Sequence, residues 1–448
     1  MTATIWAMRA IFAALVLGFV LAVAGCGGTT TATQGAAGGD ATSLVPPDAV
    51  AFIRADANLD SAQWRGLKDL VGPIDLPADY AQTIKPALGD QLNLAVLGVE
   101  QGKPETIAIV KTNDDAKLRT LAAKFDQGDE HYTVEHVGEW SVVADSPEAF
   151  AAVRSAQSGR SLADVPAFQS ATGRLDSNAF AAAFVDGARL GGVSDKTASV
   201  TQLLGSPRWV TAQVTAQGDA LRVDARAGTP KQARAAYRPT LLRDVPSGAL
   251  LAVSFKDANV ALNRVAGKSS FRDALAELKE YAGVNAAQLA PALRGEGVYY
   301  VTQTALLPTL VLEVESPNPA ATARTFRTIA ANLSAKAHNM LQLEVFQRGN
   351  RVYLTNAASV PSASGSSLVD DKSFKDALAA AGAPAAVNWL AYADVHRLAP
   401  IVQVLSQLLG GSQSSRQQGE KLDRLGTLVA YGARAGADNR VSVRITHH

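Results

Sequence analysis

Cysteine is almost absent from this sequence, since Cys26 is the single cysteine in 448 residues. A chain with one thiol forms no internal disulfide, so burial of apolar side chains has to stabilise the fold. The composition allows this, because 47% of the residues are hydrophobic. At about 100 to 200 residues per domain, a chain of this length is expected to form two or three domains.

An excess of charge of one sign is also missing. The chain contains 42 lysines and arginines and 41 aspartates and glutamates. Residues 1–25 include Arg9 and no acidic residue, so the remaining residues carry 41 charges of each sign. Proteins attract nucleic acids and anionic membrane surfaces through an excess of basic residues. The balance therefore argues against nucleic acid as a partner and against electrostatic binding to a membrane.

Long hydrophobic runs are missing after the first 25 residues. The apolar stretch 10–24 is shorter than the about 20 residues that a membrane-spanning helix needs, and Cys26 follows it closely. The later run 306–314 contains Pro308 and Glu313, which favours a buried strand. We therefore expect no transmembrane helix in the mature chain.

The N-terminal segment has the order of a secretory signal. One basic residue, Arg9, precedes an apolar region that ends in Val23-Ala24-Gly25-Cys26. This ending resembles the bacterial lipobox, which implies that residues 1–25 are removed as a signal peptide and that the Cys26 thiol carries a diacylglyceryl group. Two acyl chains give stable anchoring. We therefore predict a lipoprotein on the extracytoplasmic face of a bacterial cell membrane.

A tether is expected between the lipid and the first fold. Residues 26–42 comprise the lipidated cysteine and a segment rich in glycine, threonine and alanine, without a large apolar side chain. Such a segment does not join a hydrophobic core. A flexible chain of this length has a root-mean-square reach of about 20 to 25 Å.

An internal repeat organises the rest of the chain. Five segments recur in the same order at an offset of about 200 residues, as expected of two copies of one unit. The matched segments are 45–58 with 245–259, 86–89 with 291–295, 104–125 with 308–338, 138–145 with 349–356, and 161–168 with 367–374. We predict repeat 1 over 43–230, a linker over 231–240, and repeat 2 over 241–446.

Local patterns in each copy are those of an α+β fold. Residues 114–125 carry apolar side chains at the spacing of one helix face, behind a predicted cap at Asn113. In 221–225 apolar and polar residues alternate, which is typical of a strand with one face in water. The copies are expected to end in hairpins over 210–225 and 429–445. We predict that each copy is a mainly antiparallel sheet with helices packed on one face.

A further likeness lies in the opening of repeat 1. The residues that carry it are Val45-Pro46-x-x-Ala49, Asp56 and Asn58 after the first strand, Trp64, and Lys85-Pro86-Ala87-Leu88-Gly89-Asp90. Together they resemble the DUF3352 family of uncharacterised bacterial exported proteins. The resemblance covers most of residues 43–445, although Ala87 stands where the family pattern has a bulkier residue. It implies an exported protein and no particular activity.

No motif in the sequence carries a complete set of catalytic groups. His131 and His136 are close in sequence, but a spacing of five on a strand places them on opposite faces. His396 lies near Asp394 without the Gly-x-Ser-x-Gly motif of a hydrolase. The run 266–269 is similar to the end of a P-loop but lacks the first glycine of that motif. We therefore predict a non-enzymatic protein with no catalytic residues, no metal site and no cofactor.

Four polar residues are the best candidates for a ligand site. Asp56 with Asn58 and Asp257 with Asn259 follow the first predicted strand of the two copies. Asp and Asn at such positions bind nearby backbone amides and cap the next helix, and we prefer this structural interpretation. A ligand or ion site at these residues is the alternative.

Two functions from different classes fit the sequence. The first is a binding or scaffolding module whose partner is another envelope protein, which the lack of catalytic motifs favours. The second is a carrier of a lipid or another apolar molecule in a cavity between sheet and helices, which the apolar content permits. In both cases the lipid on Cys26 holds the protein on the membrane.

Overall fold

The fold is that of a computed structural model, which describes most of the chain after the predicted tether. The described residues are 39–72, 80–100, 103–126, 131–193, 206–228, 235–266, 271–303, 308–336, 342–360, 365–408, 422–436 and 438–448. Cys26 and the signal peptide lie outside them. The chain divides into two compact units. Unit 1 contains the described residues of 39–228 and 435–441, and unit 2 those of 235–434 and 442–448.

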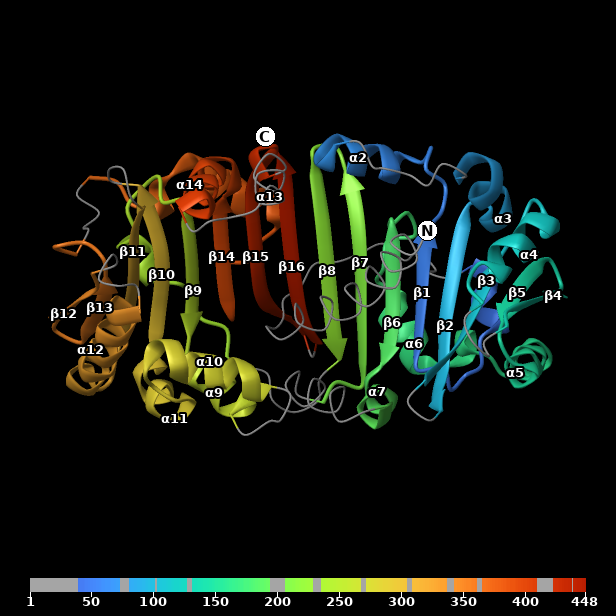
Figure 1. The fold of residues 1–448 in the computed structure, drawn as a ribbon, viewed down its shortest axis with the longest axis horizontal. Coiled ribbons are helices and arrows are strands. Elements are labelled where there is room, and N and C mark those ends of the chain that lie inside the picture. The colour runs from blue at the N-terminus through green and yellow to red at the C-terminus, as the bar shows by residue number, and fades with distance from the viewer. Residues whose placement is uncertain are drawn as a thin grey trace. The chain divides into compact units, whose positions relative to one another are not determined.

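Unit 1 is built on antiparallel strands in the order β8-β7-β6-β1-β2-β3-β5-β4 (Figure 1). The strands are β1 (Ala51–Asp56), β2 (Gln91–Glu100), β3 (Lys103–Val110), β4 (Thr133–Val137), β5 (Trp140–Ala144), β6 (Ala181–Asp186), β7 (Trp209–Gln217) and β8 (Ala220–Gly228). The helices are α2 (Ala62–Val71), α3 (Lys85–Leu88), α4 (Asp115–Ala123), α5 (Pro147–Ser158), α6 (Pro166–Thr172) and α7 (Gly187–Val193), with short turns η1 (Gly39–Leu44), η2 (Tyr80–Ile84) and η3 (Leu162–Asp164).

Unit 2 has strands in the order β12-β13-β11-β10-β9-β14-β15-β16. The strands are β9 (Leu251–Lys256), β10 (Glu296–Gln303), β11 (Pro308–Glu315), β12 (Glu344–Arg348), β13 (Arg351–Thr355), β14 (Trp389–Asp394), β15 (Leu425–Ala435) and β16 (Asp438–His447). The helices are α9 (Ala258–Val265), α10 (Arg272–Ala282), α11 (Ala286–Leu289), α12 (Pro319–Lys336), α13 (Lys372–Ala381) and α14 (Val395–Leu408), with η4 (Leu241–Arg243), η6 (Ala290–Leu293) and η7 (Leu368–Asp370). Both units are therefore α+β and antiparallel, as predicted.

Helices cover both faces of each set of strands, so the predicted cover of one face is wrong. Neighbouring side chains of a strand point to opposite faces, and β3 has apolar residues at consecutive positions. Ile109 packs in one cluster with Phe168 of α6, and Val110 packs in another with Leu118 of α4. The corresponding contacts in unit 2 are Val311 with Phe374 of α13 and Val314 with Phe326 of α12. Two apolar faces need two helical layers.

The unit boundaries differ from the predicted ones at two places. Tyr237, placed in the predicted linker, is 7% exposed and belongs to the core of unit 2. Its hydroxyl lies 2.8 Å from that of Ser254 on β9. Ala435–Val441, placed in repeat 2, is grouped with unit 1. Apolar and polar contacts of individual residues, which the repeat pattern does not encode, cause both differences.

The predictions of single helices and hairpins were more reliable than those of the unit boundaries. The hairpin predicted over 210–225 is confirmed by β7 and β8, which pair along their length. The helix predicted over 114–125 is confirmed as α4, but its cap is Asp114 and not Asn113. A carboxylate oxygen of Asp114 accepts a hydrogen bond from the Lys117 backbone amide at 3.1 Å. None of the helices in the described residues combines the length and hydropathy of a membrane span.

Candidate functional site

Asp56 and Asn58 form hydrogen bonds within the loop that joins β1 to α2. One Asp56 carboxylate oxygen accepts a hydrogen bond from the backbone amide of Asn58 at 2.8 Å, and the other accepts one from the Ser61 hydroxyl at 2.5 Å. Ser61 is the residue that caps α2, because its hydroxyl accepts from the Trp64 amide. Asp56 therefore holds the cap in place and is not itself the cap. All of these bonds stabilise local structure.

Asp257 and Asn259 are placed differently. Asp257 precedes α9 in a left-handed conformation, with φ of 50°, and its side chain makes no capping bond. Its carboxylate instead accepts from the Gly295 amide at 2.9 Å, which ties the end of β9 to the turn before β10. The side-chain oxygen of Asn259 is buried without a hydrogen-bond partner in the described part of the chain. The predicted direct cap is absent here.

Replacing Asp56 tests the structural interpretation. Asp56→Ala removes the acceptor for the Ser61 hydroxyl and is expected to lower stability by about 0.5 to 2 kcal/mol, whereas Asp56→Asn keeps one acceptor and should cost less. Calorimetric melts with and without divalent ions measure both effects. Asp69→Ala, at an exposed position of α2, is the matched control. Stabilisation of the wild type by a divalent ion, lost in Asp56→Asn, would contradict the structural interpretation.

A polar pocket of about 190 Å³ opens at the start of α4. Its lining residues are Thr112, Asn113, Asp114, Asp115, His136, Gly138, Glu139 and Ser141. His136 on β4 lies directly opposite Ser141 on β5. The His136 ring contacts Asp115 at 2.8 Å through Nε2 and Ser141 at 3.2 Å through Nδ1. No pattern in the sequence indicates that these three residues meet.

These three residues have the side chains of a hydrolase triad but not its geometry. Ser141 is 2% exposed, and its hydroxyl also lies 3.5 Å from the Asp115 carboxylate, so the three groups form a closed triangle. A triad nucleophile has to reach a substrate carbonyl while its base is oriented from the far side. The arrangement instead fastens the first turn of α4 to the β4–β5 hairpin. His131, by contrast, lies 3.4 Å from Asp126, outside this pocket.

No metal centre is found in the described residues, where no group of three or more His, Cys, Asp and Glu side chains could hold an ion. The predicted candidates Asp56, Asn58, Asp257 and Asn259 are not lining residues of the polar pocket. Cys26 lies outside the described residues.

A buried carboxylate in unit 2 was not recognised from the sequence. Glu313 on β11 is 1% exposed, and it accepts a hydrogen bond from Arg351 at 3.1 Å. The same Arg351 nitrogen donates to Asp244 at 2.7 Å. Tyr353 lies opposite Glu313 on β13 and is hydrogen-bonded to it. Burial raises the pKa of Glu313 to about 7; Arg351 opposes this rise and Asp244 adds to it.

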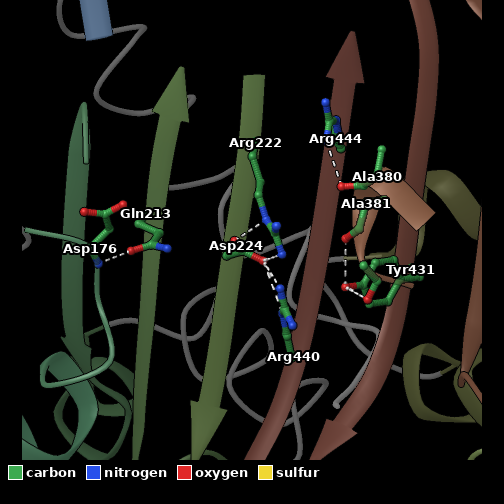
Figure 2. Close-up of polar contacts among 10 residues, drawn as sticks. Asp176, Gln213, Arg222, Asp224, Ala380, Ala381, Tyr431, Arg440 and Arg444 are labelled. Carbon is green, nitrogen blue, oxygen red and sulfur yellow. Dashed lines mark hydrogen bonds and ion pairs between the residues drawn. The ribbon is translucent and has the colours of Figure 1, made fainter. Parts of the chain in front are cut away.

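Unit 1 has a group of paired charges on the polar face of β8. Asp224 accepts from Arg222 at 2.6 Å and from Arg440 at 2.7 Å (Figure 2). Burial alone would raise the pKa of Asp224, but Arg440 and Arg222 together lower it. Arg440 is 4% exposed. The alternating pattern of this strand predicted a face in water, whereas Asp224 is paired with Arg222 and Arg440 and is largely buried.

Comparison with known proteins gives little. No known protein family matches the sequence, and no curated protein matches it. A solved structure, crystal form III of TP0453, is similar over 43% of this chain and 81% of its own, with 11% sequence identity and a TM-score of 0.26. A likeness of this size carries no argument about fold or function.

Proposed function

We propose that this protein is a lipid-anchored component of the bacterial envelope that binds or supports another envelope protein and has no catalytic activity. The observation that carries the proposal is the run Val23-Ala24-Gly25-Cys26 behind a short apolar segment. The single cysteine of the chain stands where the lipobox resemblance requires it.

The proposal includes two tandem copies of one unit, and the strand orders support it. The strand after Pro86 lies between β1 and β3, and the strand after Pro291 lies between β9 and β11. Backbone bonds also recur at matching positions. The Leu162 amide donates to the Val45 carbonyl, and the Leu368 amide donates to the Val245 carbonyl, both at 2.8 Å. Likewise the Asp186 amide donates to the Val50 carbonyl at 2.9 Å, and the Asp394 amide donates to the Leu250 carbonyl at 2.8 Å.

One side-chain contact that the five matched segments do not include recurs as well. Arg189 donates to the Asp48 carbonyl at 2.8 Å, and Arg397 donates to the Gly248 carbonyl at 3.3 Å. Each arginine also follows an aspartate by three residues at the end of a strand. The family resemblance to DUF3352 rests on other positions and stays a prediction.

Binding of a protein partner is favoured over transport of an apolar molecule by the chemistry of the pocket in unit 1. Its lining carries Asp114, Asp115, His136 and Glu139, which suit polar contacts. A carrier of a lipid needs an apolar cavity of several hundred Å³. The triangle of Asp115, His136 and Ser141 supports the non-enzymatic part of the proposal, because its serine is closed off.

Cys26→Ser tests the anchor. The variant is expected to leave the membrane fraction or to accumulate with its signal peptide uncleaved, because the thiol is the acylation point. Fractionation after a high-salt and alkaline wash, with mass spectrometry of the N-terminus, measures this. Thr31→Ser in the tether is the matched control and should remain bound. Equal retention of wild type and Cys26→Ser after both washes would count against lipidation.

The partner is tested on the intact lipoprotein taken from its own membranes. Crosslinking before extraction, followed by mass spectrometry of proteins and lipids, should yield a crosslinked envelope protein. One apolar molecule per chain, retained through purification, would instead support the carrier.

A further inference from the structure

Arg226 is the member of the charged group on β8 that has no hydrogen bond in the described part of the chain. Residues two apart on a strand share a face, so Arg226 lies on the same face as Arg222 and Asp224. The Asp224 carboxylate is already engaged by Arg222 and Arg440. The other carboxylate of the group, Asp438, accepts from Arg174 at 2.7 Å.

The group has more positive than negative charge. Its members in unit 1 are Arg174, Arg222, Arg226, Arg440, Asp224 and Asp438. Four guanidinium groups face two carboxylates, which leaves two positive charges uncompensated. Burial lowers the pKa of Arg226 the most, and the positive charges of Arg440 and Arg174 lower it further. A protein in which charges are balanced overall thus concentrates like charges at one partly buried place.

Thr211 supplies a second and independent observation. It is directly opposite Arg226 in the pairing of β7 with β8, so the two side chains are neighbours on one face. Thr211 is 0% exposed, and its hydroxyl has no hydrogen-bond partner in the described residues. A buried hydroxyl without a partner is rare in folded proteins and requires an explanation. An acceptor oxygen beside Thr211 would satisfy it.

We propose that unit 1 binds a phosphate group through the Arg226 guanidinium and the Thr211 hydroxyl, with Arg174 and Arg440 supplying the surrounding charge. A phosphate offers several acceptor oxygens, which suit the planar fork of an arginine together with a hydroxyl. Inorganic phosphate or a phosphomonoester carries up to two negative charges and a phosphodiester headgroup carries one, against the two uncompensated positive charges of the group. The ligand is either a soluble phosphate compound or an anionic phospholipid headgroup. The assignment goes beyond the proposed function, because it adds a phosphate ligand to a module that is proposed to bind another envelope protein.

Isothermal titration of the intact lipoprotein with inorganic phosphate tests the site. The protein is held in nanodiscs of phosphatidylcholine. The wild type is expected to bind at millimolar concentration or below, and Arg226→Gln to weaken binding about tenfold or more, because a charge-assisted bond is lost. Arg119→Gln removes the same charge from an exposed position of α4 and should leave the affinity unchanged. Equal affinity of the two variants, or no binding by the wild type, overturns the proposal.

Thr211→Val keeps the test valid if Arg226→Gln folds poorly. Valine keeps the shape of threonine, and the hydroxyl has no bond in the described residues to lose, so the melting temperature without phosphate should not fall. Phosphate affinity should drop about three- to tenfold. An unchanged affinity contradicts a ligand contact at Thr211.

The source of the phosphate is distinguished by adding phosphatidylglycerol to the nanodiscs. A headgroup that occupies the site should weaken the binding of inorganic phosphate. An unchanged affinity identifies a soluble phosphate compound as the ligand. None of these measurements depends on Cys26→Ser, and an unanchored protein could still bind phosphate, so failure of the site and failure of the lipid anchor are separate results.

Discussion

Between about pH 4.5 and 7, Glu313→Gln is expected to remove most of the pH dependence of the stability of unit 2. In the folded protein the pKa of Glu313 is about 7, above the ordinary 4.5 of a glutamate. The folded state therefore holds a proton that the unfolded state releases in this window. Stability from this group is complete below pH 4.5 and is lost as the pH rises through 7. The difference corresponds to about 3 kcal/mol.

Hydrogen exchange of the β11 and β13 amides measures this effect within unit 2, where a global melt would mix both units. Exchange in the wild type should accelerate as the pH rises from 4.5 to 7, after correction for the intrinsic rate, and Glu313→Gln should flatten this trend. Glu277→Gln, at an exposed position of α10, is the control. A wild-type profile as flat as that of Glu313→Gln would show that Arg351 keeps the carboxylate ionised throughout.

Gly295→Ala is expected to destabilise unit 2 by about 2 to 4 kcal/mol. Gly295 has φ of 105°, and a methyl group there would lie 2.1 Å from the Glu315 carbonyl oxygen. A backbone atom in a paired strand does not move aside easily, so overpacking adds to the conformational strain. Gly89 has the same problem in unit 1, where the Lys111 carbonyl oxygen is 2.2 Å from the added carbon. Chemical denaturation of the two variants measures both costs.

Gly349→Ala separates the cost of backbone strain from the cost of a steric clash. Gly349 has φ of 60° and open space around the added methyl group. Its replacement should cost only about 1 to 2 kcal/mol, from the left-handed conformation alone. If Gly295→Ala and Gly349→Ala lower the midpoint equally, the close approach of β11 to the turn before β10 is not important for stability.

The sequence predicted those elements that interactions between residues close in sequence determine. The helix predicted over 114–125 is α4, and the hairpin predicted over 210–225 is formed by β7 and β8. Gly382 ends α13 in the left-handed conformation that only glycine adopts readily. The antiparallel α+β class followed from alternating strands. These signals act over a few residues, so one sequence is enough to read them.

The polar sites could not be predicted because they depend on register between distant strands. Glu313 is 38 residues from Arg351 in sequence, and an isolated glutamate in a strand normally faces water. Asp224 and Arg440 are separated by 216 residues. Hydrophobic alternation was interpreted as one dry and one wet face, and it contains no information on which opposite charges will meet. The same limit hid the unpartnered Thr211 beside Arg226.

The division of β16 between the two units has a consequence for the order in which they fold. Residues 438–441 are grouped with unit 1 and residues 442–447 with unit 2. A polypeptide emerges from its N-terminus, and N-terminal domains usually fold first. Here Arg440, which pairs with Asp224 of unit 1, follows it by 216 residues and comes after most of unit 2 in the sequence. Unit 1 therefore lacks this charge partner until residues 435–441 have been synthesised, although the rest of its described residues precede unit 2 in the sequence.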